Sequence, residues 1–140
     1  MFSLQKPVVD IAIVCSDFEK SLDFYHNLLG LEIVQEVEIP ATCASGAQLA
    51  PREFRQVRLR AGETLIKLME IESPPEQGST QFRAGVRWLT FIIDDVPGTK
   101  AALEAKGVEF LSDPVAAPDA RYIVCATDPD GLLLEFVQID

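Results

Sequence analysis

The sequence predicts an α+β fold made of two tandem β-α-β-β-β modules that form a curved, cup-shaped mixed sheet. Two observations support it. Residues 10–34 and 88–111 follow one plan: an apolar strand, an acidic turn, an amphipathic helix closed by glycine, and a strand opening on Gly-Leu-Glu or Gly-Val-Glu. Similar apolar strands, at residues 65–71 and 132–139, end the two halves. Neither module can bury both faces of its sheet alone, so we expect the halves to pack together or against a second chain around a functional cleft.

Local signals place the elements of the first module. Its first strand, at residues 9–15, is rich in β-branched residues. Ser16 followed by Glu19 is a capping box that begins a helix at about Asp17, and Gly30 supplies the left-handed residue at its end. The remaining strands of this module are expected at residues 31–39, 54–60 and 65–71.

The apolar residues of this helix predict which face packs on the sheet. They recur at helical spacing, as Phe18, Leu22, Tyr25 and Leu29. His26, the only histidine, should then point to solvent, so an acid–base mechanism built on histidine has no candidate. Residues 40–51 are predicted to be a long loop of small residues, which suits either a mobile flap or a plain connector.

The second module repeats the plan after a linker rich in proline and polar residues. Asp95 is the predicted N-cap of its helix, Pro97 lies in the first turn, and Gly107 follows the last turn. Residues 128–131, Asp-Pro-Asp-Gly, predict a hairpin turn. Its strands are expected at residues 86–93, 108–111, 122–126 and 132–139. We expect a single domain over residues 1–140, with module one at about 8–72, the linker at about 73–85 and module two at about 86–140.

The composition of the chain limits the kinds of partner and the cellular location that we expect. The net charge of −10 makes nucleic acid and anionic membranes poor partners on electrostatic grounds. The sequence contains no apolar run near the roughly 20 residues that span a bilayer. Three widely spaced cysteines argue against a disulfide framework and favour a reducing, cytoplasmic location. A cysteine in a predicted strand, such as Cys15 or Cys125, is expected to behave as a small hydrophobe.

Two segments, SDFEKSLDFYHNLLGLEI at residues 16–33 and DPDGLLLEF at residues 128–136, together with the duplication, resemble the vicinal oxygen chelate superfamily. This group contains glyoxalase I, methylmalonyl-CoA epimerase, extradiol dioxygenases and the bleomycin- and fosfomycin-resistance proteins. The resemblance covers nearly the whole chain and implies the glyoxalase-like fold, with a homodimer as the expected assembly. The fold alone does not choose a chemistry, because it hosts lyases, epimerases, dioxygenases and non-catalytic binders.

In metal-dependent members of this superfamily, four ligands line the cup, usually two histidines on the first strands and two carboxylates on the last strands. The corresponding positions here are Asp10, Lys67, Trp88 and Glu135. Trp88 has no ligating atom and Lys67 is a cation that only donates hydrogen bonds. The resemblance therefore implies a lost metal site and no cofactor; the alternative is a divalent metal held by Asp10 and Glu135.

Period-two alternation indicates what replaces the metal. It places the four positions on strand faces with apolar neighbours, which is the usual composition of a site for a small organic molecule. The Lys67 ammonium is expected to take the space of the metal, flanked by Asp10 and Glu135, either as part of a site or as a structural ion pair. Trp88 is either a ligand platform or core, and Arg58 binds a ligand carboxylate or phosphate, or belongs to a solvated edge. The predicted ligand-binding residues are Asp10, Arg58, Lys67, Met69, Trp88, Thr90 and Glu135.

Three functions follow from this pattern. The first is a protein that holds a small organic ligand in an apolar cup without metal, as the missing ligands favour. The second is a lyase or isomerase of glyoxalase or epimerase type, or a dioxygenase-like enzyme, acting on a small carbonyl compound. Its catalytic residues would be Glu135 as acid or base and Lys67, or a metal, stabilising the oxyanion. The third is a dimeric relic without catalysis.

Overall fold

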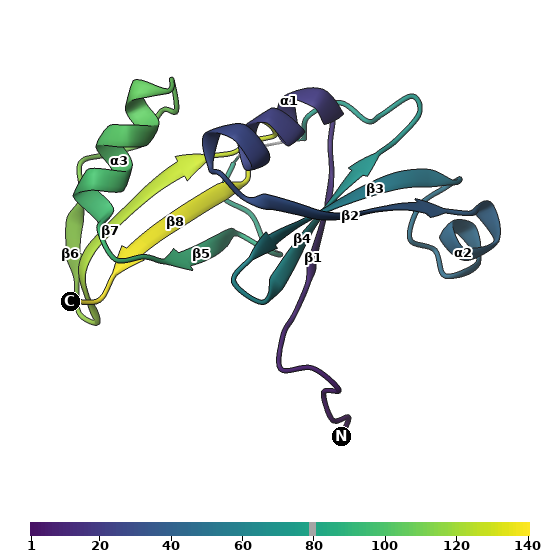
Figure 1. The fold of residues 1–140 in the computed structure, drawn as a ribbon, viewed down its shortest axis with the longest axis horizontal. Helices are drawn as coiled ribbons and strands as arrows, with labels where there is room; N and C mark the ends of the chain where they lie inside the picture. Colours follow the sequence, from purple (N-terminus) through teal and green to yellow (C-terminus); the bar gives the residue numbers. More distant parts are fainter. Residues whose placement is uncertain (79–80) are drawn as a thin grey trace. The chain divides into compact units, whose positions relative to one another are not determined.

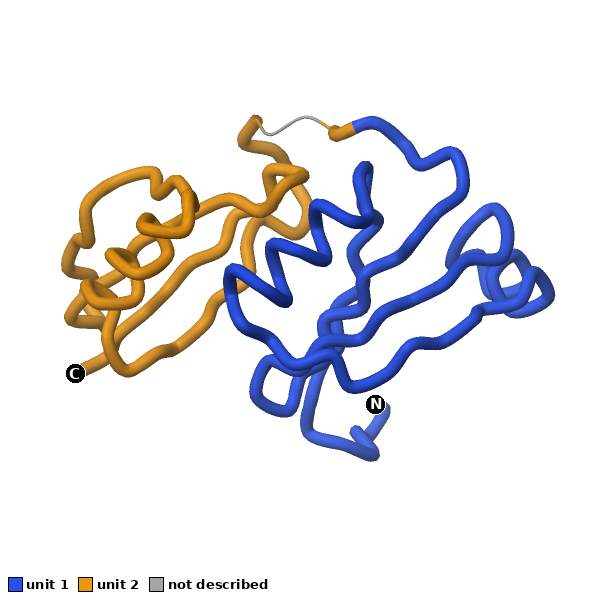
Figure 2. The backbone as a smooth tube through the Cα atoms, turned by 45° about the horizontal axis from the view of Figure 1, so that its top comes forward, with its two compact units in different colours: residues 1–76 blue, residues 77–140 orange. Residues whose placement is uncertain are grey.

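Each half of the chain folds into a four-stranded sheet of its own, and the two sheets share one strand order (Figure 1). The structure, a computed structural model, describes residues 1–78 and 81–140. It divides into unit 1, Met1–Glu76, and unit 2, Gln77–Asp140 (Figure 2). The boundary falls inside the predicted linker. The sheet orders are β1-β4-β3-β2 and β5-β8-β7-β6.

The first strand of each unit runs parallel to the last, and the other pairs are antiparallel. The predicted α+β class with two tandem modules is thereby confirmed, and each module forms a mixed sheet of its own. The elements of unit 1 are β1 (Ile11–Val14), α1 (Phe18–Leu22), η1 (Asp23–Leu28), β2 (Glu32–Ile39), α2 (Ala41–Gly46), β3 (Phe54–Ala61) and β4 (Thr64–Glu70). Those of unit 2 are β5 (Trp88–Ile92), α3 (Val96–Ala105), β6 (Val115–Ala117), β7 (Ala120–Thr127) and β8 (Leu133–Gln138).

The first helix differs from the prediction at its start and in its turns. Its N-cap is Asp17, which has an extended backbone and whose side-chain Oδ1 accepts the Lys20 N–H at 3.1 Å; the N-cap is thus one residue later than the predicted Ser16. After α1 the helix widens into the π-helix η1, in which the Leu29 N–H reaches back to the Phe24 carbonyl. The wider turn buries Phe24 beside Tyr25 (7% and 0% exposed), an arrangement that a strict 3.6-residue period does not give.

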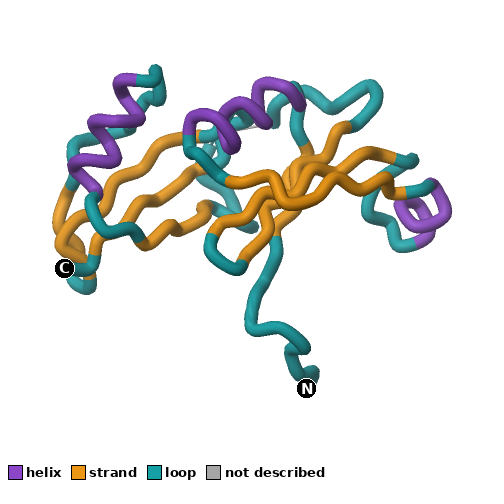
Figure 3. The backbone as a smooth tube through the Cα atoms, viewed as in Figure 1, coloured by secondary structure: helices purple, strands orange, loops and turns teal. Residues whose placement is uncertain are grey.

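Residues 40–51 contain the short helix α2 and are not a plain loop, contrary to the prediction (Figure 3). Pro40 precedes it with an extended backbone, and the small side chains that follow favour a close approach to the sheet. Ala44 is fully buried against Phe54 and Met69. Packing of this alanine, which has the highest intrinsic helix propensity, stabilises a helix that is too short to form alone.

Unit 2 follows the predicted signals at its helix and hairpin but not at its edge strand. The Asp95 side chain accepts the Gly98 N–H at 2.9 Å, as predicted for an N-cap. Asp128 accepts the N–H groups of Asp130 and Leu132, each at 2.9 Å, and so closes the predicted turn. The strand predicted at residues 108–111 is wrong: Phe110 forms only an isolated bridge with Ala126. The edge strand is β6, which follows Pro114, a residue with no N–H to donate to a ladder.

One face of each sheet packs against a helix and carries most of the core, and the other face carries the site residues, together with the smaller buried cluster around Met69 in unit 1. Helix α1 contacts β4 in unit 1, and α3 contacts β7 and β8 in unit 2. The residues of these strands that alternate toward the core are buried, among them Ile66, Leu68, Val124, Leu134 and Phe136. No helix in the described part of the chain is long and apolar enough to cross a membrane.

Replacing the N-cap of α3 tests how much this local signal contributes. Asp95→Ala removes the acceptor for the Gly98 N–H and should lower the free energy of unfolding by about 1 kcal/mol, the usual cost of a lost cap. Asp94→Ala is the matched control, an exposed carboxylate lost one residue before the cap, and should change stability by less than about 0.5 kcal/mol. Urea denaturation measures both; an equal loss would show that charge, and not capping, is responsible.

Candidate functional site

The sheet face of unit 2 that does not carry α3 is hollowed by an open pocket of about 290 Å³. Residues of β5, β7 and β8 line it, and the apolar ones surround a polar centre. Ile92, Ile123, Val137 and Ile139 provide branched apolar walls. Trp88, Thr90 and Glu135 supply the polar centre, and Asp119 adds a second carboxylate. The period-two faces predicted for residues 88–92 and 133–137 therefore meet in one hollow.

A chain of hydrogen bonds fixes the polar centre. The Trp88 indole Nε1–H donates to Thr90 Oγ1 at 3.0 Å, and the Thr90 hydroxyl donates to Glu135 Oε1 at 2.8 Å. Thr90 and Glu135 are direct partners in the parallel β5–β8 ladder, so the backbone register brings them together. These bonds hold the indole by its edge, and 49% of Trp88 remains exposed. Of the two interpretations of Trp88, this favours a platform over a core residue.

Glu135 lies between Thr90 on β5 and Cys125 on β7. Cys125 is the antiparallel partner of Glu135 across β7 and β8, which puts both side chains on one face of the sheet. Burial raises the pKa of the Cys125 thiol above its ordinary value; the Glu135 carboxylate raises it further, and Arg87 lowers it. Sequence reasoning missed this neighbour, although the turn at residues 128–131 fixes the register that pairs the two positions.

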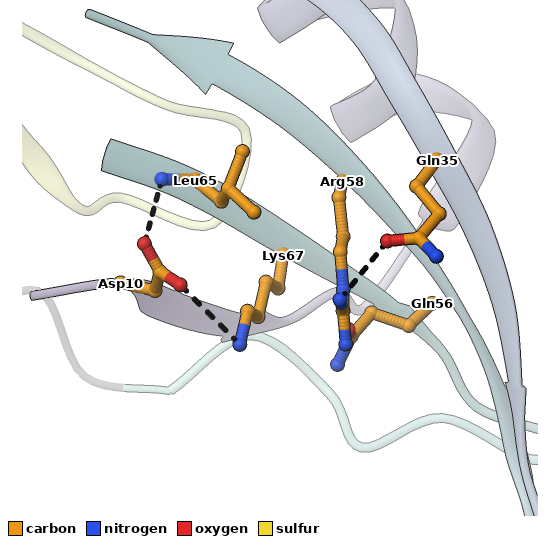
Figure 4. Close-up of polar contacts among 6 residues, drawn as sticks. All are labelled: Asp10, Gln35, Gln56, Arg58, Leu65 and Lys67. Atoms are coloured by element: carbon orange, nitrogen blue, oxygen red, sulfur yellow. Dashed lines mark hydrogen bonds and ion pairs between the residues drawn. The ribbon is translucent and has the colours of Figure 1, made fainter. Parts of the chain in front are cut away.

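In unit 1 the site residues form a charged group (Figure 4). Asp10 lies just before β1; its Oδ1 accepts the Leu65 N–H at 2.9 Å, and its Oδ2 is 3.6 Å from Lys67 Nζ. Both side chains are partly buried. Two of the three predicted partners, Asp10 and Lys67, are thus together. The predicted contact of Lys67 with Glu135 would join different units and stays a prediction.

Arg58 is the antiparallel partner of Lys67 and extends the group onto β3. Its Nε donates to Gln56 Oε1 at 2.7 Å and its Nη1 donates to Gln35 Oε1 at 3.1 Å. Sequence reasoning named Arg58 but neither glutamine. Gln56 shares the parity of Arg58 along β3, which was the available signal, whereas Gln35 requires the β2–β3 register.

Met69 and His26 occupy different surroundings from those of the polar groups. Met69 is 5% exposed; it packs in the cluster with Ala44 and Phe54 and also lines an apolar hollow of about 410 Å³ in unit 1.

His26 was predicted to point into solvent, but it is partly buried, and its Nδ1–H donates to the Leu31 carbonyl at 2.8 Å. The imidazole therefore links η1 to the segment that leads into β2.

The residues at the four positions do not fit a divalent metal. Each unit supplies one carboxylate: Asp10 is engaged by a cation and an N–H group, and Glu135 accepts from a hydroxyl. The side chains that accompany them, Lys67 and Trp88, offer donors instead of lone pairs. Over residues 1–78 and 81–140, no three histidine, cysteine, aspartate or glutamate side chains gather as metal ligands would.

Duplicated β-α-β-β-β units with functional groups on one sheet face define the glyoxalase-like class of fold. The sequence pattern of the Glyoxalase/Bleomycin resistance protein/Dioxygenase superfamily matches residues 8–136, and the chain belongs to this superfamily. Uncharacterized protein YaeR of Escherichia coli (strain K12) is 31% identical over 133 residues, which cover 95% of this chain and 96% of YaeR. YwkD of Bacillus subtilis (strain 168), also uncharacterized, is 30% identical over 138 residues, or 96% of this chain and 98% of YwkD.

The fold likeness extends to solved structures. TnmS3, an antibiotic binding protein from Streptomyces sp. CB03234, matches with a TM-score of 0.66 at 21% identity, covering 97% of this chain and 100% of TnmS3. At this identity the likeness shows the fold alone.

The electrostatic surroundings of Cys125 predict its reactivity. Because a raised pKa reduces the thiolate fraction, Cys125 should be alkylated more slowly by iodoacetamide than exposed Cys43 at mildly alkaline pH. Glu135→Gln should speed the reaction of Cys125, because the carboxylate that raises the thiol pKa is removed, and Arg87→Gln should slow it, because the cation that lowers this pKa is removed. Peptide-resolved mass spectrometry measures the rates, with Cys43 as internal standard. Shifts of the same sign in both variants would contradict the electrostatic account.

Proposed function

We propose that the protein binds a small organic molecule in the hollow of unit 2, without a metal ion. A flat apolar part of the ligand lies against the Trp88 indole, and a hydrogen-bond donor or positive charge of the ligand meets Glu135. The hydrogen-bonded chain from Trp88 through Thr90 to Glu135 carries this proposal, because it fixes an aromatic face and a carboxylate in one apolar hollow.

The chemistry of the lining residues sets the kind of ligand. A hollow of about 290 Å³ is at the small end of ligand sites, which suits a molecule the size of one or two fused rings. Aromatic rings gain from offset stacking on an indole, and a cation gains from its face. Glu135 Oε1 accepts from Thr90, while Oε2 accepts from no donor in the described chain and is available to the ligand.

The same lining residues favour binding over the enzymatic alternative. Glu135 could act as an acid or base on a carbonyl compound, but an enolate or oxyanion formed in the reaction needs a positive group or free hydrogen-bond donors beside it. The Trp88 indole N–H and the Thr90 hydroxyl already donate to Thr90 and Glu135. Among the described residues that line the hollow there is no lysine or arginine. Lys67, the predicted oxyanion stabiliser, forms an ion pair with Asp10 at 3.6 Å.

The superfamily supports a binding role in a general way. Its description includes bleomycin resistance proteins, and TnmS3, which has the same fold, is an antibiotic binding protein. Small-molecule capture is thus compatible with this scaffold, and the choice of ligand rests on the residues of the hollow.

Three probes that share a naphthalene ring test the proposal: 1-naphthylmethylamine, 1-naphthylmethanol and 1-naphthoate. We expect the amine to bind most tightly and the carboxylate least, because the hollow presents the Glu135 and Asp119 carboxylates. Trp88 is the only tryptophan, so its indole N–H resonance in a nitrogen-15 spectrum reports directly on the hollow. A Trp88 resonance that none of the probes moves would refute the proposal.

Replacing the carboxylate tests the role of Glu135. Glu135→Gln should weaken binding of 1-naphthylmethylamine by about tenfold, since hydrogen bonds to charged groups contribute about 1.5–3 kcal/mol, and should leave 1-naphthylmethanol within about threefold. Glu109→Gln, which removes an exposed carboxylate elsewhere in unit 2, is the matched control and should change neither affinity. Calorimetric titration gives the dissociation constants. Equal weakening of amine and alcohol would show a structural effect of the substitution in place of charge recognition.

A further inference from the structure

We propose that unit 1 carries a binding site of its own, for an organic carboxylate with an apolar body. The carboxylate is held by Arg58 and Lys67, and the apolar body fills the hollow beside Met69. This inference goes beyond the ligand proposed for unit 2 and does not rest on it, since every residue involved belongs to unit 1.

The positive charge of Arg58 is held in place but not neutralised. Its hydrogen-bond acceptors, Gln56 and Gln35, are neutral amides, and Arg58 forms no ion pair with any residue in the described ranges. Arg55, on the same strand with opposite parity, shows the contrasting case: it contacts Glu70 at 2.6 Å and Glu36 at 3.2 Å. One arginine of β3 is thus neutralised by carboxylates, while the other is aimed by amides, with its Nη2 donors free to bind an anion.

Lys67 adds a second cation at the same place. Lys67 and Arg58 are direct cross-strand partners, and their side chains project to the same side in Figure 4. Like charges directly opposite destabilise a sheet unless an anion compensates them. Asp10 is the anion beside Lys67, but at 3.6 Å, and its other oxygen is used by the Leu65 N–H. Within the group of Asp10, Arg58 and Lys67, two cations and one carboxylate leave one positive charge, in a protein whose net charge is −10.

An apolar hollow adjoins this charged group. Met69 follows Lys67 on the same face of β4, with Val14 opposite it on β1 and Gln56 opposite it on β3. The hollow of about 410 Å³ begins there and is lined mainly by apolar groups, including Val14, Leu49, Met69 and Ile71. Two residues along a strand span roughly 7 Å, so a carboxylate on Lys67 and Arg58 would place a short apolar chain in the hollow.

The charge balance selects a carboxylate over a phosphate. A monocarboxylate brings one negative charge and neutralises the excess positive charge of this group, with one oxygen for the Nη2 donors of Arg58 and one for the Lys67 ammonium. A phosphate monoester carries nearly two negative charges and would leave one uncompensated beside Asp10. The apolar lining also favours an organic acid with a hydrocarbon body over an inorganic anion.

Three probes of one shape test the site: 4-phenylbutyrate, its amide and the corresponding amine, 4-phenylbutan-1-amine. Calorimetric titration should detect binding of the carboxylate, with the amide at least about tenfold weaker because a charged hydrogen-bonding group is lost. The Arg58 Nε–H resonance should move with the carboxylate only. The proposal is overturned if amide and carboxylate bind equally, or if the Arg58 resonance is unmoved.

Arg58→Gln should weaken 4-phenylbutyrate about 10- to 100-fold, the range expected for charge-assisted hydrogen bonds. Arg55→Gln and Arg121→Gln remove the same charge, the first from the other face of β3 and the second from unit 2, and should leave its affinity unchanged. Thermal unfolding of each variant confirms that the fold is intact. Equal weakening by all three variants would mean that only net charge matters, which overturns a built site.

Asp10→Asn separates a ligand site from a structural ion pair. The new amide oxygen can still accept the Leu65 N–H, while the carboxylate that competes for Lys67 is gone. Affinity for 4-phenylbutyrate should therefore rise about two- to fivefold, which corresponds to a partly exposed ion pair. An unchanged affinity would show that Lys67 takes no part in binding the carboxylate and would remove Lys67 from the site.

Glu135→Gln tests the proposed carboxylate site of unit 1 separately from the proposed ligand site of unit 2. It should leave 4-phenylbutyrate binding unchanged, just as Arg58→Gln should leave 1-naphthylmethylamine binding unchanged. A loss of 4-phenylbutyrate binding in Glu135→Gln would assign the carboxylate to unit 2 and overturn the inference.

Discussion

The parallel pairing of the first and last strands in each unit is the constraint on which the remaining arrangement depends. This ladder cannot close through a tight turn, so a helix and two further strands lie between its members in sequence. Its register decides which side chains become neighbours: Ala12 faces Lys67 in unit 1, and Thr90 faces Glu135 in unit 2. A slip of one residue would move Lys67 and Glu135 to the core faces, where an unpaired charge is costly. The buried residues beside them, Ile66 and Leu134, fix the register against that slip.

The two units place different chemistry on one scaffold. The same row of the sheet reads Ala12, Lys67, Arg58 in unit 1 and Thr90, Glu135, Cys125 in unit 2. The first row is cationic, and the second holds a carboxylate among neutral groups. Because the residues on the core faces stabilise the fold, the residues of each row can differ in charge between the two units without a change in the backbone. Arg58, Lys67 and Glu135 therefore lie where substitution has little effect on packing.

Local sequence signals predicted the fold correctly where a single residue determines the conformation of the backbone around it. Asp95 and the turn at residues 128–131 are of this kind, since a capping carboxylate and a positive-φ glycine act within a few residues. Most errors in the predicted secondary structure arose where side-chain packing determines the backbone conformation. The π-helical turn buries Phe24, and the helix around Ala44 packs against Phe54 and Met69. Periodicity has no access to such contacts. The edge strand β6 is a different case, because it pairs with β7, the next strand in sequence, in a short hairpin that the prediction did not contain.

The site divides in the same way, and the division explains what was missed. Alternation along single strands was enough to place Lys67, Trp88, Thr90 and Glu135 on the open faces. Gln35, Gln56 and Cys125 become visible only when antiparallel registers are known, because each matters through its cross-strand neighbour. These neighbours decide the chemistry. An arginine beside carboxylates, like Arg55, serves the structure, whereas an arginine beside amides, like Arg58, keeps its charge for another partner. The acceptor next to a charged side chain is therefore a better guide to its role than the residue type itself.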